Sequence, residues 1–120
     1  MKRPYGGKAV ELARIAPNFE RYTQTILFDD LWDRPGLSQR DRSLITIAAL
    51  ITMHRPEQMI GHMQTGLENG LTREELAETI AHLAFYASWS SAAVAARKLH
   101  DLAMGQDRDL RGASPPRMSD

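Results

Sequence analysis

The chain has 120 residues, the size of a single domain with room for one hydrophobic core. Lys plus Arg and Asp plus Glu each number 15, so the formal net charge is zero and a nucleic-acid-binding role is disfavoured. No apolar run approaches the roughly 18 residues of a membrane span, and the N-terminus lacks the apolar stretch of a secretory signal. We therefore expect a cytoplasmic protein that binds neither membrane nor nucleic acid.

The sequence contains no cysteine. This absence excludes disulfides, thiolate metal ligands, thiol nucleophiles and dithiol redox cycling. It removes more classes of function than any other feature of the composition.

The first part of the chain predicts two helices. Residues 9–16 form a short apolar segment that Pro17 stops, and Asn18 can cap a second helix that reaches about Trp32. The residues expected on the inner side of this second helix are Phe19, Tyr22, Ile26 and Leu27.

A third helix is expected after the 34-RPG-36 break, over residues 38–53. Ser38 suits its N-cap and Asp41 its first turn. The run 44-LITIAALITM-53 is apolar on nearly every face, which would also suit a buried strand, but its length and the lack of a partner strand favour a helix. A helix that is apolar all round must be covered on all sides, so we expect neighbouring subunits to supply part of the cover.

Three more helices follow. Pro56 suits the first position of a fourth helix, which Asn69-Gly70 ends. Thr72 and Glu75 form a capping box for a fifth helix that runs to about Ala87. An alanine-rich sixth helix is expected over residues 91–104. The fold class is therefore all-α, with about six helices in one domain over residues 1–107 and a flexible polar tail over 108–120.

The predicted fifth helix carries a polar stripe beside its apolar face. The stripe consists of Glu75, Glu78, Thr79, His82, Tyr86 and Trp89, at spacings of three or four residues. Carboxylate, imidazole and phenol together could transfer protons, with a glutamate orienting His82. The alternative is a solvated face in which Glu75 only caps the helix and the rings lie at the edge of the core.

The predicted fourth helix places His62 near Met59, Met63 and Gly66. A glycine costs a helix up to about 1 kcal/mol relative to alanine, so Gly66 indicates that another element packs closely there. Methionines suit irregular ligand cavities, although a histidine with a satisfied hydrogen bond at the core edge explains His62 equally well. His54, in the preceding turn, is expected to be exposed.

Arginines flank the predicted start of the third helix. A helix N-terminus beside a guanidinium suits a carboxylate ligand, which makes Arg42 and Arg34 candidate anchors. Alternatively, these arginines remain in water or pair with Asp30, Asp33 and Asp41. We find no motif with metal-ligand spacing, no phosphate loop and no nucleophile elbow, and expect neither a metal nor a cofactor.

Taken together, these segments resemble the γ-carboxymuconolactone decarboxylase family of the alkylhydroperoxidase D-like superfamily. The resemblance rests on 28-FDDLWDRPGLSQRDRSLITIAAL-50, His62, 66-GLENGLTREEL-76, Glu78, His82 and Tyr86, and covers roughly residues 20–103. It implies an all-α fold built round a helical hairpin and an obligate homo-oligomer, either a trimer or a hexamer.

The redox branch of the superfamily uses a C-x-x-C pair, a histidine four residues later and an upstream glutamate. The histidine matches His62, but Arg55 and Gln58 occupy the cysteine positions and Ser43 lies near the glutamate position. Without a thiolate there is no peroxide-reducing nucleophile, so a hydroperoxidase activity is disfavoured.

The other branch decarboxylates a carboxylated lactone, in which the substrate itself accepts the electrons left by CO₂. The resemblance therefore implies a cofactor-independent lyase acting on a small carboxylate or lactone. We assign His62 as general acid, His82 and Tyr86 as polar stabilisers of the oxyanion, and Arg42 and Arg34 as carboxylate anchors. The further substrate-binding residues expected are Trp89, Met59 and Glu78.

One segment departs from the family pattern. Decarboxylases carry a glycine and proline turn after the position of Tyr86, whereas this chain has 87-ASWSS-91. The departure leaves the substrate open. It also leaves open an alternative function, a noncatalytic oligomeric small-molecule-binding protein on the same fold.

Overall fold

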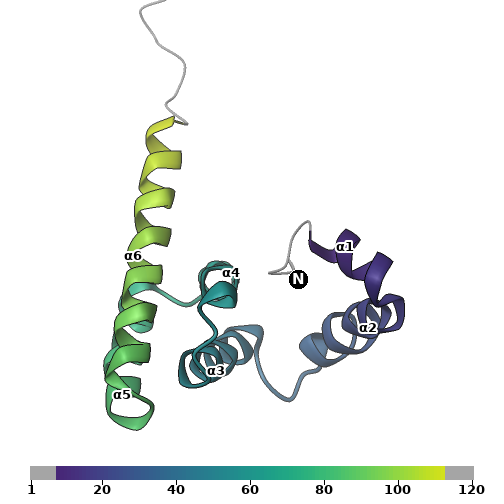
Figure 1. Cartoon of the computed structure of the whole chain (residues 1–120). Helices are drawn as coiled ribbons and strands as arrows, with labels where there is room; N and C mark the ends of the chain where they lie inside the picture. The colour runs from purple at the N-terminus through teal and green to yellow at the C-terminus, as the bar shows by residue number, and fades with distance from the viewer. Residues whose placement is uncertain (1–7, 113–120) are drawn as a thin grey trace, which may run out of the picture.

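The structure is a computed structural model and describes residues 8–112 (Figure 1). Across these residues the backbone is helical and contains no strand, which confirms the all-α prediction. None of the helices described is long and apolar enough to cross a membrane. The cytoplasmic location remains a prediction.

An N-terminal arm stands apart from the rest of the helices (Figure 1). It consists of α1 (Lys8–Ile15), α2 (Pro17–Tyr22), a π-helical segment, η1 (Thr23–Phe28), and a 3₁₀ turn, η2 (Leu31–Asp33). The break at Pro17 is where the sequence predicts it. The expected cap at Asn18 is wrong, because Ala16 precedes the helix and Pro17 takes its first position, where a missing N–H costs nothing.

The predicted inner side of the second helix is also wrong. Phe19 and Ile26 are 59% and 58% exposed, whereas Phe28 and Trp32 are buried and stack with their ring centroids 6.3 Å apart. The helix switches to i→i+5 pairing, as the bond from Asp29 N–H to the Gln24 carbonyl shows at 2.9 Å. This switch turns the later residues, rather than the earlier ones, toward the body of the molecule.

The body consists of α3 (Gln39–Thr52), α4 (Pro56–Glu68), α5 (Arg73–Tyr86) and α6 (Trp89–Gly112). Ser38 caps α3 by accepting the Asp41 N–H at 3.0 Å, as predicted. Pro56 begins α4, also as predicted. Within α3, Ile47 and Ile51 are buried but Ile45 is 56% exposed, so part of this apolar helix remains uncovered within one chain.

The hairpin between α4 and α5 forms through the signals that the sequence contains. Gly70 adopts a φ of 112°, and the Leu71 N–H reaches back to the Gly66 carbonyl at 2.9 Å, which closes the end of α4. Thr72 and Glu75 form the complete capping box of α5. These contacts set the reversal of direction between the two helices.

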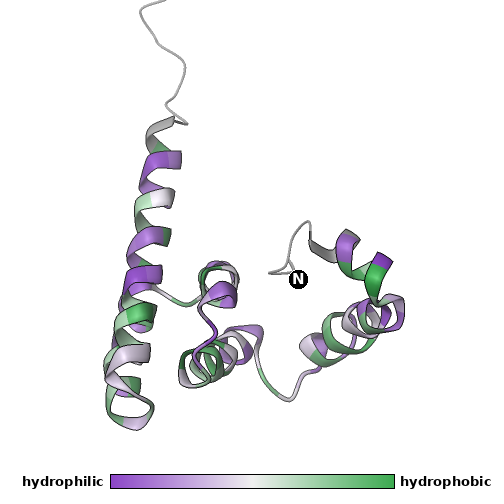
Figure 2. Cartoon of the chain, viewed as in Figure 1, coloured by the Kyte–Doolittle hydropathy of each residue, from purple (hydrophilic) through white to green (hydrophobic). Residues whose placement is uncertain are grey.

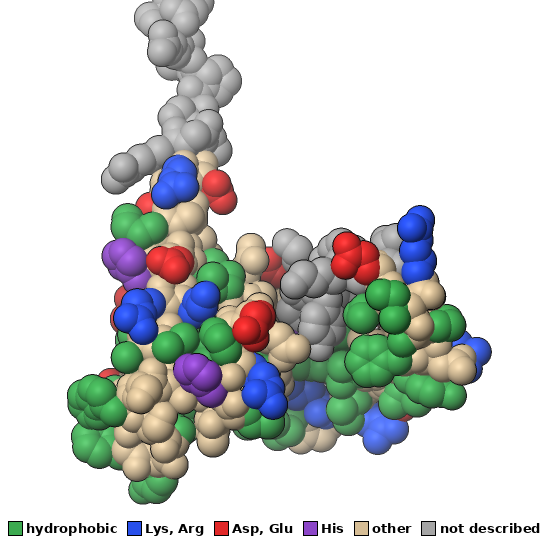
Figure 3. Space-filling model, viewed as in Figure 1, with side chains coloured by type: hydrophobic (Ala, Val, Ile, Leu, Met, Phe, Trp, Pro, Cys, Tyr) green, Lys and Arg blue, Asp and Glu red, His purple; other side chains and the backbone are tan. Residues whose placement is uncertain are grey.

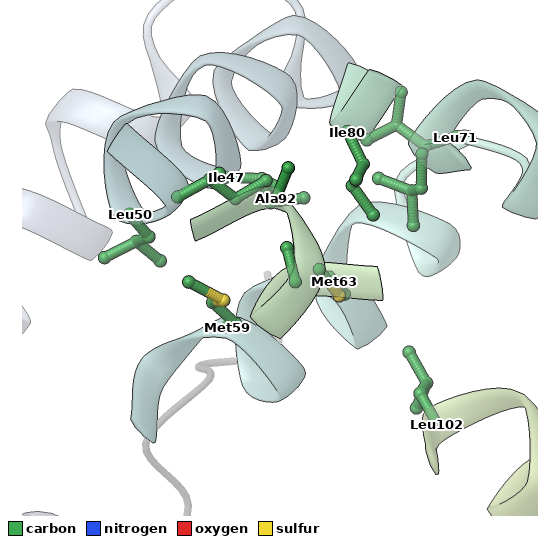
Figure 4. Packing of buried hydrophobic residues seen from close by; sticks show 11 residues of the cluster. Ile47, Leu50, Met59, Met63, Leu71, Ile80, Ala92 and Leu102 are labelled. Atoms are coloured by element: carbon green, nitrogen blue, oxygen red, sulfur yellow. The ribbon is translucent and has the colours of Figure 1, made fainter. Parts of the chain in front are cut away.

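The hydrophobic core lies among α3, α4, α5 and α6 (Figure 4). Ile47, Met59, Met63 and Leu76 are among its fully buried side chains. Burial of such side chains contributes roughly 1.5–3 kcal/mol each to folding. The core therefore fixes α4 between α3 and α6, and with it one wall of the site described below.

The last helix is longer than the sequence predicts. It begins at Trp89, where Ser88 accepts the Ser91 N–H at 3.0 Å, and continues to Gly112, well beyond residue 104. Figure 2 shows hydrophilic residues prevailing on its C-terminal half, which extends beyond the other helices. The predicted tail thus begins inside α6, and residues 113–120 lie outside the described part.

Candidate active site

His62 lies in the second turn of α4 and is buried, with 6% of its surface exposed. The same helix directs Met59 and Met63 into the core. One turn after His62, a Cβ on Gly66 would lie 2.9 Å from Leu71 Cδ1 and 3.1 Å from Ile47 Cδ1. The close approach inferred from this glycine is therefore present, and it holds α3 firmly against the helix that carries His62.

His62 borders a cavity of about 590 Å³ between the N-terminal arm and the first two turns of α4. The volume lies within the range of small-ligand pockets. The lining residues from the arm are Glu11, Leu12, Ile15, Phe19 and Thr23. The lining residues from α4 are Glu57, Gln58, Ile60, Gly61 and His62. Among the described residues, the cavity lining combines an apolar wall, two carboxylates and one imidazole.

Burial lowers the pKa of His62 below its usual value of 6.5, because the charged imidazolium loses hydration inside the protein. The imidazole is consequently neutral at pH 7 in the free protein. The first turn of α4, which contributes Glu57 and Gln58 to the cavity, has no side-chain cap. The positive end of the helix dipole therefore borders the same cavity as the histidine.

His82 and Tyr86 lie on a different surface. Their rings stack on α5 with centroids 4.7 Å apart, and Tyr86 is 78% exposed. His82 lines a shallow groove between α3 and α5 together with Arg40 and Glu78. Glu75 of the same stripe accepts the Thr72 N–H and pairs with Arg40. One chain does not bring these two rings into the His62 cavity.

The predicted carboxylate anchors do not line the His62 cavity either. Arg34 donates two hydrogen bonds to Asp30, at 2.9 and 2.8 Å, which lowers the pKa of that exposed carboxyl. Arg42 donates to the Arg34 carbonyl at 3.2 Å, while its Nε is buried without a hydrogen-bond partner among the described residues. For Arg34, the alternative of pairing with Asp30 is what the structure shows.

The remaining residues expected to contact the substrate also lie outside the His62 cavity. Met59 is fully buried in the core, and Trp89 is 70% exposed with its ring edge-on to Phe85 at 5.9 Å. His54 is exposed, as expected, but takes a left-handed φ of 56° and lies 3.2 Å from Ser91 Oγ through Nδ1. It therefore ties the turn before α4 to the start of α6.

No group of three or more His, Asp and Glu side chains within the described residues is arranged to hold a metal ion. Residues 17–101 match the family model for the carboxymuconolactone decarboxylase family. The chain belongs to this family. The match confirms the resemblance found in the sequence, and the chain is a cysteine-free member.

Two curated proteins are similar in sequence to the central part of this chain. A 4-carboxymuconolactone decarboxylase of Acinetobacter baylyi is 36% identical over 70 residues, which are 58% of this chain and 52% of the relative. A nitrosuccinic acid decarboxylase of Metarhizium robertsii is 33% identical over 86 residues, which are 68% of this chain and 60% of the relative. The matched segments thus span somewhat more than half the length of each curated relative.

The cavity contains residues to which the sequence analysis gave no role in a site. Gln58, named there only because it occupies a cysteine position, lies four residues before His62, so helical spacing from His62 could have found it. Glu57 lies five residues before His62, and that spacing does not predict a shared face. Glu11 and Phe19 reach the cavity because the arm lies across from α4. That arrangement is tertiary, and no local spacing predicts it.

Proposed function

We propose that this chain is a decarboxylase that removes CO₂ from a small carboxylated compound in the His62 cavity. The observation that carries the proposal is the buried His62 on the wall of a cavity of ligand size. Membership of the family and two relatives named as decarboxylases support the reaction class. The substrate is proposed only as a carboxylate whose electrons can move into a neighbouring carbonyl.

The reaction breaks the bond between the carboxylate carbon and its neighbour. The electron pair stays on the neighbouring carbon and spreads into the carbonyl, which becomes an enolate oxygen while CO₂ leaves. A proton then goes to that carbon, so the sum is R–COO⁻ plus H⁺ giving R–H plus CO₂. The protein's tasks are to hold the carboxylate, stabilise the enolate oxygen and deliver the proton.

His62 is the proposed proton donor, and its burial imposes a condition on that role. A donor must carry the proton, yet the lowered pKa keeps the free imidazole neutral at pH 7. A bound carboxylate beside it reverses the balance, because an opposite charge favours the imidazolium. We therefore propose that substrate binding draws a proton onto His62, with the uncapped start of α4 helping to hold the anion.

The other predicted site residues lie outside the His62 cavity, and we assign them no step in the reaction. His82 and Tyr86 are on the outer surface of α5, and Trp89 follows them at the start of α6. Figure 3 shows hydrophobic side chains gathered there and, separately, on the arm. Exposed apolar groups at two places support a proposed homo-oligomer in which one copy's arm and another copy's α5 end are covered.

A direct test measures CO₂ release by the full chain from 4-carboxymuconolactone and from simple β-oxo acids, above the uncatalysed rate. The substitution His62→Gln should lower a measured turnover about a hundredfold or more, because it removes the proton donor. The matched change His82→Gln, in the other groove, should lower it far less. Tight retention of a small carboxylate with no turnover across the panel would instead favour the noncatalytic binding protein.

A further inference from the structure

The proposed reaction has one task to which no residue is yet assigned, the stabilisation of the enolate oxygen. This oxygen gains negative charge as CO₂ leaves, whereas the proton of His62 goes to the neighbouring carbon. By standard bond lengths and angles, that oxygen and that carbon are about 2.4 Å apart. A hydrogen-bond donor close to His62, on the wall of the same cavity, would therefore complete the site.

Gln58 lies on α4 four residues before His62, and both residues line the cavity beside the arm. Residues four apart on a helix share a face, with their Cβ atoms about 5–6 Å apart. From that separation, side chains as long as glutamine and histidine can converge on two atoms of one small molecule. The helix register thus brings a carboxamide next to the proposed proton donor.

The side chain of Gln58 is available to a ligand. It is exposed, and its carboxamide forms no hydrogen bond with any of the described residues. Its backbone N–H, in contrast, donates to the Arg55 carbonyl at 3.2 Å, at the start of a helix that Met59 and Met63 fix in the core. A firmly held backbone thus carries a carboxamide that is free to donate.

The other polar side chains on the described lining suit this task less. Glu11 and Glu57 accept hydrogen bonds when ionised and have no proton to donate. Thr23 already donates its hydroxyl proton to the Phe19 carbonyl at 2.8 Å. The carboxamide of Gln58, by comparison, offers two N–H groups and remains uncharged.

We infer that the Gln58 carboxamide donates a hydrogen bond to the enolate oxygen while His62 delivers the proton to the neighbouring carbon. This inference rests on the proposed function for the identity of that oxygen. Gln58 transfers no proton, so the balance of the reaction is unchanged. The two residues have separate tasks, because His62 must gain and lose a proton whereas the carboxamide stays a neutral donor throughout the cycle.

The kinetic effect of losing this hydrogen bond depends on when the charge on its acceptor forms. The enolate charge develops only in the transition state, where a hydrogen bond to it becomes stronger. Loss of the bond therefore lowers kcat and leaves KM nearly unchanged. A side chain that only held the departing carboxylate would instead affect KM, since that charge is already present in the bound substrate.

The first experiment replaces Gln58 by methionine, which has a similar length and no N–H group. CO₂ release by the full chain from 4-carboxymuconolactone and from acetoacetate is measured above the uncatalysed rate. On each compound that the wild type turns over, Gln58→Met should lower kcat about tenfold to a hundredfold and change KM less than about threefold. The larger losses known for buried oxyanion donors are not expected, because Gln58 is exposed.

The matched control is Gln64→Met, the same substitution at an exposed position of the same helix that does not line the cavity. It should leave both kcat and KM as they are in the wild type. A higher KM with unchanged kcat in Gln58→Met would overturn the inference and assign this side chain to the carboxylate. A kcat that Gln58→Met lowers no more than Gln64→Met would also overturn it.

A second experiment tests the contact with an oxyanion without the reaction. p-Nitrophenol is yellow only when ionised, so its absorbance in the presence of the protein reports the ionisation of the bound molecule. A donor beside the phenol oxygen favours the ionised form. The wild type and Gln64→Met should therefore lower the pKa of the bound phenol, and Gln58→Met should reduce its ratio of ionised to neutral form by about tenfold.

The two experiments separate this inference from the proposed reaction. A shift in phenol ionisation that depends on Gln58, without CO₂ release from any compound, would refute the decarboxylase proposal and retain Gln58 as an oxyanion contact. CO₂ release with equal phenol ionisation in the three proteins would retain the reaction and overturn the role of Gln58.

Discussion

The burial of His62 makes the stability of the protein depend on pH in a way that one substitution can isolate. The pKa of His62 is lowered in the folded state, and in the unfolded chain it returns to about 6.5. Above pH 6.5 both states are neutral, and the histidine adds no pH dependence. Below it, the unfolded chain gains a proton that the folded protein resists, so the free energy of unfolding falls as pH falls.

The upper limit of this effect follows from the unfolded state alone. Protonating a group with a pKa of 6.5 stabilises the unfolded chain by about 1.4 kcal/mol at pH 5.5 and by less than ~0.1 kcal/mol at pH 7.5. The stability advantage of the wild type over His62→Gln should therefore shrink by up to about 1.4 kcal/mol between these pH values. A variant without the imidazole has nothing to protonate there.

The difference in the free energy of unfolding between the wild type and His62→Gln is measured by urea denaturation at pH 7.5, 6.5 and 5.5. Unfolding is followed by helical circular dichroism at a fixed protein concentration. The lowered pKa values of Asp30 and Glu75 cancel, because both proteins retain these carboxyls. The control is His100→Gln, at an exposed position. Its difference from the wild type in the free energy of unfolding should not shrink between these pH values. Parallel stability curves for the wild type and His62→Gln would refute the claim that burial disfavours the charged form.

Other predictions concern the turn after α4 and the state of assembly. Gly70→Ala should destabilise the protein by about 1–2 kcal/mol, because its φ of 112° is unfavourable for a residue with a Cβ. Gly105→Ala, with nothing within 4 Å of the added Cβ in α6, should instead stabilise it by up to about 1 kcal/mol; equal shifts in the urea midpoints of the two variants would contradict this. Light scattering should give a mass well above 13.5 kDa, and Phe85→Ser with Trp89→Ser should lower it. A monomeric wild type would exclude the proposed covering of the exposed apolar groups.

The helices of the body were predictable because their ends are encoded locally. Ser38, Pro56, Gly70 and Thr72 each act within a few residues of their own position, through a cap, a missing N–H or a positive φ. The arm was not predictable in the same way. Its switch to π-helical pairing and the burial of Trp32 against the rest of the molecule occur together, and local spacing reveals neither.

Only one wall of the candidate site could be predicted from the sequence, for a related reason. His62 stands out through its position in the family pattern and the close approach at Gly66. His82 shares a stripe with Tyr86 on its own helix, but spacing within α5 does not say which way that stripe faces relative to α4. The second wall of the cavity comes from α1 and α2, whose placement depends on the whole path of the chain between them and α4.

The most direct test of the account is the release of CO₂ by the wild type, His62→Gln and His82→Gln, assayed side by side on one panel of β-oxo acids. If His62 is the proton donor, the wild type should turn over substrate and His62→Gln should lose about a hundredfold or more of this rate. The rate of His82→Gln should change by less than about threefold. Turnover that survives in His62→Gln but fails in His82→Gln would move the chemistry to the groove between α3 and α5 and contradict the account.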